Sequence, residues 1–289
     1  MTISGKTHLY AVIGDPIAHS LSPAMHNAAF QALGVDAVFL AFKVAPAQVA
    51  DAVRGMRGLG IRGLNVTMPD KDAVVPCLDE IDEVAKFLNS VNTVFNDGGR
   101  LRGFSTDGAG AHRALEENGV KLAGKKLVLL GAGGAARAIA FELARESEEL
   151  VILNRTPEKV SGLAQVLNSK FQKKITAGPL TSVNIERSLG DADVLINATS
   201  VGMCPDERRC LVKSSWLKSD LTVMDIIYNP LETELAKEAK AAGAKVISGV
   251  EMLVHQGAVS FEIWTGKAAP VEVMRQAVLS HLNVRGVNT

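Results

Sequence analysis

The sequence lacks an excess of charge of either sign, because it has 31 lysine and arginine residues and 31 aspartate and glutamate residues. A balanced chain has no electrostatic reason to bind nucleic acid or an anionic membrane surface. It also lacks an apolar run long enough to span a bilayer. Its first residues, "MTISGKTHLYAVIGDP", lack the basic start, apolar middle and small-residue cleavage site of a signal peptide. We therefore expect neither nucleic acid nor a membrane as a partner.

Cysteine is scarce, with only Cys77, Cys204 and Cys210 among 289 residues. An odd and sparse set fits a reducing compartment better than a disulfide framework, so we expect a cytoplasmic protein. No histidine stands near Cys204 or Cys210 in the sequence, as the ligand spacing of a zinc site would require. We therefore expect no metal in the functional site.

Internal repeats and low-complexity linkers are also absent, and the chain instead alternates strand and helix patterns. In "SPAMHNAAFQALG", Met25, Ala29 and Leu33 follow helical spacing, and Gly34 can end the helix in the left-handed conformation. The same reasoning predicts further helices within residues 47–60, 108–119, 134–146, 231–243, 250–266 and 270–282, and strands within residues 8–16, 37–44, 61–69, 125–130, 149–154, 192–200, 221–230 and 244–249. Strands that alternate with helices imply mostly parallel sheets covered by helices. The predicted fold class is therefore α/β, with enough chain for two domains.

One stretch, "VNTVFNDGGRLRGFSTD", has a different pattern. Two strand-like runs flank Asp97, Gly98 and Gly99, which are typical residues of a tight turn. We expect a β-hairpin there.

A glycine-rich turn follows the strand pattern "KKLVLL". Gly131, Gly133 and Ala136 form the G-x-G-x-x-A fingerprint between a strand and a helix, which is the context that a dinucleotide site requires. Gly131 permits the tight turn, Gly133 lets backbone approach a pyrophosphate, and Ala136 allows close packing of helix on strand. The alternative is a glycine loop that only turns the chain. The predicted phosphate-binding turn comprises Gly131, Ala132, Gly133, Gly134 and Ala135.

The next strand ends in "LNRTPEK", where an NAD-binding site would have an acid for the ribose 2′-hydroxyl. Asn154, Arg155, Thr156 and Lys159 stand there instead. A guanidinium can grip a 2′-phosphate that a carboxylate would repel. A basic turn in solvent is the alternative interpretation. The absence of the acid favours NADP as the cofactor.

The chain resembles the shikimate dehydrogenase family over essentially its whole length. The family's motifs occur in order as "GDPIAHSLSPAMHN", "GLNVTMPDK", "SVNT", "STDGAG", "LGAGGAARA", "NRTPEK", "INATSVGM", "YNP" and "MLVHQGA". The resemblance implies reversible, NADP-linked reduction of 3-dehydroshikimate to shikimate in aromatic amino-acid (chorismate) biosynthesis. It implies a substrate-binding and catalytic domain at 1–107, a Rossmann-type NADP-binding domain at 108–250, and C-terminal helices at 251–289 that return to the first domain.

The resemblance also assigns the substrate carboxylate to Ser20 and Ser22 of "HSLSP". Two hydroxyls can donate to a carboxylate, and a helix N-terminus favours an anion. Ser22 also precedes Pro23, so it is equally a candidate for a helix N-cap with proline at the first helical position.

Five further residues are implied as substrate contacts. Asn65, Thr67, Asn92 and Gln256 would bond substrate hydroxyls, and a site built to do so rejects analogues that lack them. Asn92 could instead cap a turn, and Gln256 could lie on a helix surface. Tyr228 of "YNP" could line the site or be a core tyrosine with a satisfied hydroxyl. For the cofactor, the resemblance adds Thr199 and Gly249.

Lys71 and Asp107 match the family's catalytic pair. Reduction of a ketone needs hydride on carbon and a proton on oxygen, and a lysine can deliver that proton. Desolvation favours a neutral lysine, whereas a neighbouring carboxylate favours the charged form and orients it. Two residues depart from the family's usual pattern: Asp70 stands where His or Asn is more common, and Ser105 where Asn is. Asp70 adds a negative charge beside Lys71 in sequence.

Three alternatives remain open at the level of sequence. Quinate, which has one more hydroxyl on the carbon that bears the carboxylate, could be a second or a preferred substrate, and cofactor use could be dual. A non-catalytic sensor of dinucleotide or shikimate would keep the glycine turn but could lose Lys71 or Asp107, and both are present. Another two-domain dehydrogenase acting on a folate or amino acid is disfavoured by "HSLSP". The oligomeric state is expected to be a monomer or a homodimer.

Overall fold

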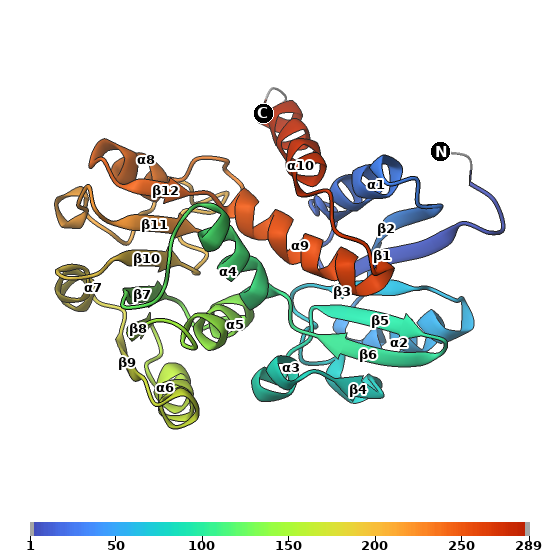
Figure 1. The fold of residues 1–289 in the computed structure, drawn as a ribbon, viewed down its shortest axis with the longest axis horizontal. Coiled ribbons are helices and arrows are strands. Elements are labelled where there is room, and N and C mark those ends of the chain that lie inside the picture. The colour runs from blue at the N-terminus through green and yellow to red at the C-terminus, as the bar shows by residue number, and fades with distance from the viewer. Residues whose placement is uncertain (1–2, 287–289) are drawn as a thin grey trace. The chain divides into compact units, whose positions relative to one another are not determined.

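The computed structural model describes residues 3–286. Within it the chain forms two compact units, each with its own sheet. Unit 1 comprises the residues up to Gly110 together with those from Val254 onward, and unit 2 comprises Ala111–Leu253. The α/β fold class is confirmed, since each unit combines a six-stranded sheet with helices (Figure 1).

Unit 1 is built on a mixed sheet with the strand order β2-β1-β3-β5-β6-β4. Its strands are β1 (His8–Gly14), β2 (Ala37–Lys43), β3 (Gly63–Val66), β4 (Glu80–Ile81), β5 (Thr93–Asp97) and β6 (Arg100–Phe104). β2 and β3 pair with β1 in parallel, whereas β5 is antiparallel to both β3 and β6. The hairpin is confirmed: Asp97 pairs with Arg100 across a turn in which Gly98 and Gly99 have φ of 60° and 99°.

The helical elements of unit 1 are α1 (Ser22–Ala32), η1 (Pro46–Gln48), α2 (Val49–Gly58), η2 (Val75–Cys77), α3 (Glu83–Leu88) and α10 (Val271–Gly286). α4 (Asp107–Glu117) and α9 (Gly249–Thr265) each contain a boundary between the units. α10 packs on α1 (Figure 1). The prediction that the C-terminal helices return to the N-terminal part of the chain is therefore confirmed.

An aromatic cluster fixes the last part of α9 on the sheet of unit 1. Trp264 donates its indole N–H to the carbonyl oxygen of Val94 at 2.9 Å, and its ring lies 5.4 Å from that of Tyr10 and 5.3 Å from that of His26. Gly63 permits this approach, because a Cβ atom there would lie 2.6 Å from the indole ring. Aromatic side chains bury on the order of 150–250 Å² each, so this cluster is a large part of the apolar core.

Unit 2 contains a parallel sheet with the strand order β12-β11-β10-β7-β8-β9. Its strands are β7 (Lys126–Leu130), β8 (Glu149–Asn154), β9 (Lys174–Pro179), β10 (Val194–Asn197), β11 (Thr222–Asp225) and β12 (Lys245–Ile247), and its helices are α5 (Gly134–Leu143), α6 (Glu158–Phe171), α7 (Ser182–Leu189), η3 (Ser214–Trp216) and α8 (Glu234–Ala241). This is the doubly wound order of the Rossmann fold, as predicted.

The order of unit 2 has a switch point between β7 and β10, from which the chain winds outward in both directions. Ligands of doubly wound sheets bind at the carboxyl ends of the strands beside such a point. The strands here are nearly continuous apolar runs, with Leu127, Val128, Leu129 and Leu130 fully buried, as expected of a parallel sheet covered on both faces. The polar residues that follow β7 and β10 are therefore the place to look for a dinucleotide.

The described residues also bear on membrane-spanning helices and on the state of the cysteines. No helix between residues 3 and 286 combines the length and the apolar character that crossing a bilayer requires. All three cysteines lie in this part of the chain and carry free thiols.

Candidate active site

The candidate catalytic residues of unit 1 meet because β5 runs against its neighbours. Asn65 at the end of β3 pairs with Thr93 at the start of β5, and Thr93 pairs with Phe104 at the end of β6. The carboxyl ends of two strands and the amino end of a third therefore lie at one edge of the sheet. The chain places Lys71 shortly after the first of these ends and Asp107 shortly after the second.

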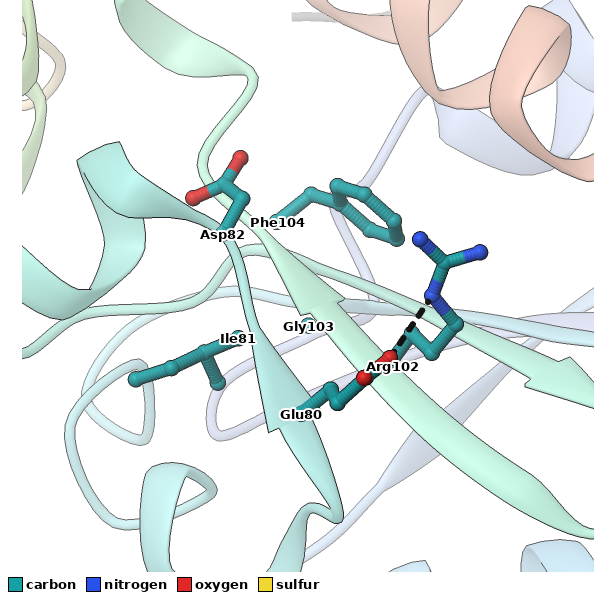
Figure 2. Close-up of a pocket in the computed structure, with 6 residues that line it drawn as sticks. All are labelled: Glu80, Ile81, Asp82, Arg102, Gly103 and Phe104. Atoms are coloured by element: carbon teal, nitrogen blue, oxygen red, sulfur yellow. Dashed lines mark ion pairs between the residues drawn. The ribbon is translucent and has the colours of Figure 1, made fainter.

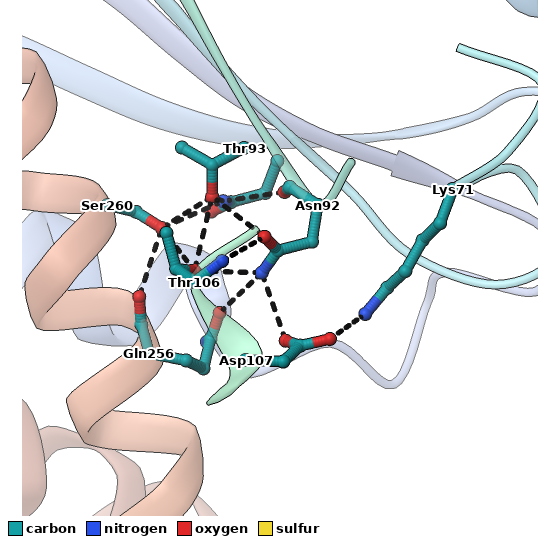
Figure 3. Close-up of polar contacts among 8 residues, drawn as sticks. Lys71, Asn92, Thr93, Thr106, Asp107, Gln256 and Ser260 are labelled. Atoms are coloured by element: carbon teal, nitrogen blue, oxygen red, sulfur yellow. Dashed lines mark hydrogen bonds and ion pairs between the residues drawn. The ribbon is translucent and has the colours of Figure 1, made fainter. Parts of the chain in front are cut away.

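Lys71 and Asp107 form an ion pair in which Nζ donates to Oδ2 (Figure 3). The two side chains are only 19% and 10% exposed, so the pair is largely shielded from water. The Val91 N–H donates to the Lys71 carbonyl oxygen at 2.7 Å and fixes the backbone from which the lysine projects. A shielded and held ammonium group of this kind can deliver a proton in a defined direction.

Asn92 binds the other oxygen of the Asp107 carboxylate. Its Nδ2 donates to Asp107 Oδ1 at 3.0 Å and to Thr106 Oγ1 at 2.8 Å, while its Oδ1 accepts from the Thr106 N–H at 2.7 Å. Gln256 Oε1, on α9, lies 3.4 Å from the same Nδ2. The structure thus brings four of the sequence-predicted residues together: Lys71, Asn92, Asp107 and Gln256 (Figure 3).

Asn65 contributes a buried acceptor next to this group. Its Nδ2 donates to the Asn92 carbonyl oxygen and to Thr93 Oγ1, both at 3.1 Å. Its Oδ1 is buried and has no hydrogen-bond partner among the described residues. A buried oxygen without a donor is unfavourable by about 1–3 kcal/mol. A ligand hydroxyl would remove that penalty.

Ser20 and Ser22 lie close together at the start of α1, although not as the N-cap interpretation predicted. The N-cap residue is Leu21, and Ser22 is the first residue of the helix, so the N-cap prediction for Ser22 is wrong. The Ser20 hydroxyl instead accepts from the Ser22 N–H at 3.3 Å and takes over part of the capping role. Thr67 is half-buried just after β3, and its N–H donates to the Ile13 carbonyl oxygen at 3.0 Å.

Asp70 does not pair with Lys71. Its carboxyl group is fully buried, and neither oxygen has a hydrogen-bond partner among the described residues. Burial raises the pKa of Asp70, and the nearby charges of Asp72 and Asp15 raise it further. Ser105, the other departure from the family's pattern, is half-buried in the loop between β6 and α4.

In unit 2 the glycine turn lies at the switch point. Gly131 has φ of +116°, and a Cβ atom there would lie 2.5 Å from the Ala198 carbonyl oxygen after β10, so no other residue fits. Ala132 and Ala135 are half-buried, and Gly133 and Gly134 are exposed. Gly133 is the N-cap of α5, with open space where its Cβ would stand. An exposed helix N-terminus without side chains suits a pyrophosphate.

The tip of β8 lies beside this turn in the sheet, because β8 pairs with β7. Asn154 donates its Nδ2 to the Thr156 carbonyl oxygen at 2.9 Å and shapes the tip. Arg155, Thr156 and Lys159 are exposed. Two exposed cations beside a hydroxyl fit a phosphate better than a ribose hydroxyl, which agrees with the prediction of NADP.

A buried polar network holds the loop that faces the glycine turn, and sequence reasoning missed most of it. Asn197 Oδ1 accepts from the Thr199 hydroxyl at 2.8 Å, and Asn197 Nδ2 donates to Asp225 Oδ1 at 3.0 Å. The Thr233 hydroxyl donates to Asp225 Oδ2 at 2.6 Å. Burial raises the pKa of Asp225, although these hydrogen bonds oppose that rise. The motif "INATSVGM" pointed to Thr199 but not to its partners.

The remaining two predicted residues lie after β11. Tyr228 is half-buried in unit 2. Gly249 is the first residue of α9 and is buried, with the Ile227 carbonyl oxygen 2.4 Å from where its Cβ would stand. The tight contact between this residue and the end of β11 explains why glycine occupies the position.

A shallow pocket lies at the β4 edge of the sheet in unit 1 (Figure 2). It is lined by Glu80, Ile81, Asp82, Arg102, Gly103 and Phe104. Its charged groups already have partners: Glu80 pairs with Arg102 at 3.2 Å, and Asp82 accepts from the Ala85 N–H at 2.6 Å as the N-cap of α3. These groups stabilise the edge strand, and none of the sequence-predicted site residues lines the pocket.

Three family models match the chain. The family model of the shikimate dehydrogenase substrate binding domain matches residues 12–94. The model of shikimate/quinate 5-dehydrogenase matches residues 112–231, and that of the shikimate 5′-dehydrogenase C-terminal domain matches residues 249–279.

Individual proteins match over nearly the whole chain. A shikimate dehydrogenase (NADP(+)) from Methanopyrus kandleri is 51% identical over 285 residues, which are 98% of this chain and 98% of that protein. The crystal structure of a shikimate dehydrogenase in complex with NADP+ superposes with a TM-score of 0.90 at 43% identity, over 97% of this chain and 98% of that chain. The shikimate 5-dehydrogenase of Listeria monocytogenes, in complex with shikimate and NAD, superposes with a TM-score of 0.91 at 39% identity, over 96% and 98%.

Proposed function

The chain belongs to the shikimate dehydrogenase family, as its motifs predicted, and on this premise we propose that it catalyses the reversible, NADP-linked reduction of 3-dehydroshikimate to shikimate. This step belongs to chorismate and aromatic amino-acid biosynthesis. The observation that carries the proposal is the shielded Lys71–Asp107 ion pair, which provides the proton chemistry that reduction of a ketone requires.

Lys71 is the proton donor in the proposed mechanism. Its Nζ donates a proton to the ketone oxygen as the carbon receives hydride, and in the oxidation direction the neutral amine takes the proton from the hydroxyl. Asp107 holds Nζ in place and balances its charge, and Asn92 holds Asp107 through the opposite carboxylate oxygen. When bound, NADPH supplies the hydride.

The substrate is held by polar groups of unit 1. The hydroxyls of Ser20 and Ser22 donate to its carboxylate, and the orphan Oδ1 of Asn65 accepts from a ring hydroxyl. Thr67 and Gln256 complete the set, and the resemblance adds Tyr228 as a further substrate contact. A ligand that lacks one of these hydroxyls would leave a buried protein group unpaired, which is the physical basis of selectivity.

NADP is held by unit 2. Its pyrophosphate would rest on the N-terminus of α5 at the glycine turn, and Arg155 and Lys159 would neutralise the 2′-phosphate. Thr199 lies in the loop after β10, and Gly249 is the first residue of α9, which follows β12. In this proposal residues 1–107 and 251–289 bind substrate and residues 108–250 bind NADP.

Initial rates of the purified protein with shikimate and with quinate, each with NADP+ and with NAD+, test the proposal. Shikimate with NADP+ should give the highest kcat/KM. A higher value with quinate would identify a quinate dehydrogenase instead. The absence of turnover with every pair, in a protein that binds shikimate or NADP+ by calorimetry, would identify a sensor.

Two properties complete the proposal. The oligomeric state we propose is a monomer or a homodimer, which sedimentation velocity distinguishes. The free thiols of the three cysteines suit a reducing cytoplasm, which we propose as the location of the protein.

A further inference from the structure

Three hydroxyl groups of unit 1 lie next to Asn92, and the proposed mechanism gives them no role. They belong to Thr93 at the start of β5, Thr106 before α4, and Ser260 on α9 (Figure 3). All three residues are buried. Thr93 Oγ1 and Ser260 Oγ are 2.8 Å apart, and Thr106 Oγ1 is 3.3 Å from each of them.

The contact between Ser260 and the Gln256 carbonyl oxygen fixes the direction of the hydrogen bonds among these three hydroxyls. The Ser260 hydroxyl donates to the Gln256 carbonyl oxygen at 3.0 Å, and a carbonyl oxygen can only accept. The Ser260 oxygen is then an acceptor for Thr93. Thr106 in turn donates to Thr93 or to Ser260, which leaves the Thr106 oxygen as an acceptor for Asn92 Nδ2 at 2.8 Å.

The direction of these hydrogen bonds determines which acceptors the two amide protons of Asn92 reach. One reaches Thr106 Oγ1 and the other reaches Asp107 Oδ1 at 3.0 Å. The Thr106 N–H donates to Asn92 Oδ1 at 2.7 Å, so Thr106 contacts both ends of the amide. If the Ser260 hydroxyl is removed, Thr93 loses its acceptor at 2.8 Å, and Asn92 Oδ1, 3.4 Å away, becomes the alternative acceptor.

We propose that Ser260, Thr93 and Thr106 are positioning residues that set the orientation of the Asn92 amide and, through it, of the Asp107 carboxylate that holds Lys71. The inference rests on the proposed dehydrogenase function. Ser260 is the unexpected member, since it is separated from Thr106 by 154 positions in the sequence. Through Ser260 the backbone of Gln256, a proposed substrate residue, is tied to the proton-donating pair.

The primary test is Ser260→Ala, with kcat for shikimate oxidation measured in two backgrounds. In the otherwise wild-type chain kcat should fall about 3- to 10-fold, the scale of one net hydrogen bond, while the KM for NADP+ stays within 2-fold. In the Asp107→Asn background the same change should lower kcat by less than 2-fold, because the residue through which Ser260 acts is already lost. An equal factor in both backgrounds, or no effect in either, overturns the inference.

A second pair of variants guards against a folding defect. Thr106→Val removes the hydroxyl at nearly constant volume, and Thr106→Ser keeps it. Thr106→Val should lower kcat by the same 3- to 10-fold, and Thr106→Ser should restore most of it, whereas equal losses in both would mean that packing alone matters. The matched control is Ser147→Ala in unit 2, which removes a buried hydroxyl that has no hydrogen-bond partner among the described residues, and it should leave kcat unchanged.

These outcomes are separable from failure of the proposed function. If the unmodified chain does not oxidise shikimate with NADP+, the function is wrong. If it does and Ser260→Ala behaves like Ser147→Ala, the function stands and the positioning role is wrong.

Discussion

The ammonium group of Lys71 pairs with the carboxylate of Asp107, 36 positions away, and not with Asp70, its neighbour in the chain. The antiparallel strand β5 makes this possible, because it brings the segments after β3 and β6 to the same edge of the sheet. Asp107 is held at its second oxygen by Asn92. The Asp107 carboxylate is therefore bound at both oxygens. It holds the ammonium group of Lys71 in one direction, as a group that moves a proton requires.

Replacement of the lysine should act on the chemical step. Lys71→Met should lower kcat for shikimate oxidation by about 10²–10⁴-fold, the usual contribution of general acid–base catalysis, with only a modest change in substrate affinity. A lysine used for binding alone would instead raise KM and leave kcat unchanged. Steady-state kinetics at saturating NADP+ distinguish the two cases.

The pair should also behave as a unit. Asp107→Asn should lower kcat, and the double variant should lose less than the product of the two single losses, because both changes disrupt the same interaction. Lys43→Met is a matched control, since Lys43 forms an exposed ion pair with Asp15 at 3.4 Å. Its kcat should stay within 2-fold of the wild type. An unchanged kcat for Lys71→Met would leave this lysine no catalytic role.

Cofactor choice should depend on Arg155. Arg155→Ala should weaken NADP+ binding by roughly 1.5–3 kcal/mol, the scale of a hydrogen bond to a charged group, and leave NAD+ binding nearly unchanged. The reason is that only NADP carries the 2′-phosphate, and Arg155 stands exposed at the tip of β8. Calorimetric titration with each cofactor measures the difference. Arg187→Ala, on the surface of α7, serves as control, and equal losses for both cofactors in Arg155→Ala would mean that this residue does not read the phosphate.

Much of the fold follows from local patterns. The hairpin turn at Gly98 and Gly99 and the helix end at Gly34 were predicted because glycine at positive φ leaves a local signal, and the structure has both. The hairpin prediction covers the antiparallel pairing of β5 with β6, but the antiparallel pairing of β5 with β3 was not anticipated. The short elements β4 and α3 were missed as well, since two and six residues are too few for a periodic pattern. The elements α6, β9 and α7, between residues 158 and 189, were not predicted either.

The site residues likewise divide into those that sequence motifs reveal and those that only the fold brings together. Lys71 and Asp107 belong to motifs, so the resemblance found them. The N-cap prediction for Ser22 followed a sound rule but was displaced by one residue, because the Ser20 oxygen serves the Ser22 N–H instead. Ser260 had no signal at all: a buried serine on an apolar helix acquires a partner only when the fold places Thr93 beside it. Contacts between residues this far apart in the sequence are set by the fold as a whole.

Asp70 should destabilise the protein at neutral pH. Its pKa is raised in the folded state, chiefly by burial, so the fold favours the protonated form. Stability is therefore lost as the pH rises from the unfolded pKa of about 4 through the raised folded value. Asp70→Asn should raise the free energy of unfolding at pH 7 by about 1–3 kcal/mol, since it removes a buried charge that has no hydrogen-bond partner among the described residues. Urea unfolding at pH 7 and at pH 4 measures the gain.

The gain should shrink at pH 4, close to the unfolded pKa, where the carboxyl group of the wild type carries less charge than at pH 7. Asp220→Asn is the control, because Asp220 is an exposed carboxylate of unit 2, and exposed charges contribute little. A gain of the same size at both values of pH would mean that the charge of Asp70 is not the cause.

His26 should make the protein sensitive to acid. The ring is fully buried, stacks on Phe39 at a centroid distance of 4.5 Å, and has no hydrogen-bond partner at either nitrogen among the described residues. Burial lowers the pKa of His26 from 6.5 to about 3. Only the unfolded state binds the proton between these values, so stability is present above pH 6.5 and is lost as the pH falls toward 3. The loss should be about 2 kcal/mol between pH 7 and pH 5, from 1.36 kcal/mol per pKa unit.

Urea unfolding of His26→Phe over the same range tests this origin. The variant removes the titrating group and keeps an aromatic ring against Phe39, so its free energy of unfolding should change by less than about 1 kcal/mol between pH 7 and pH 5. Overpacking can lower the stability of the variant at every pH, but it cannot restore the dependence of the unfolding free energy on pH. His26→Leu provides a smaller replacement. His281→Gln removes an exposed histidine from α10 and should keep the acid sensitivity of the wild type. If His26→Phe and His26→Leu lose stability with acid as steeply as the wild type, another group is responsible.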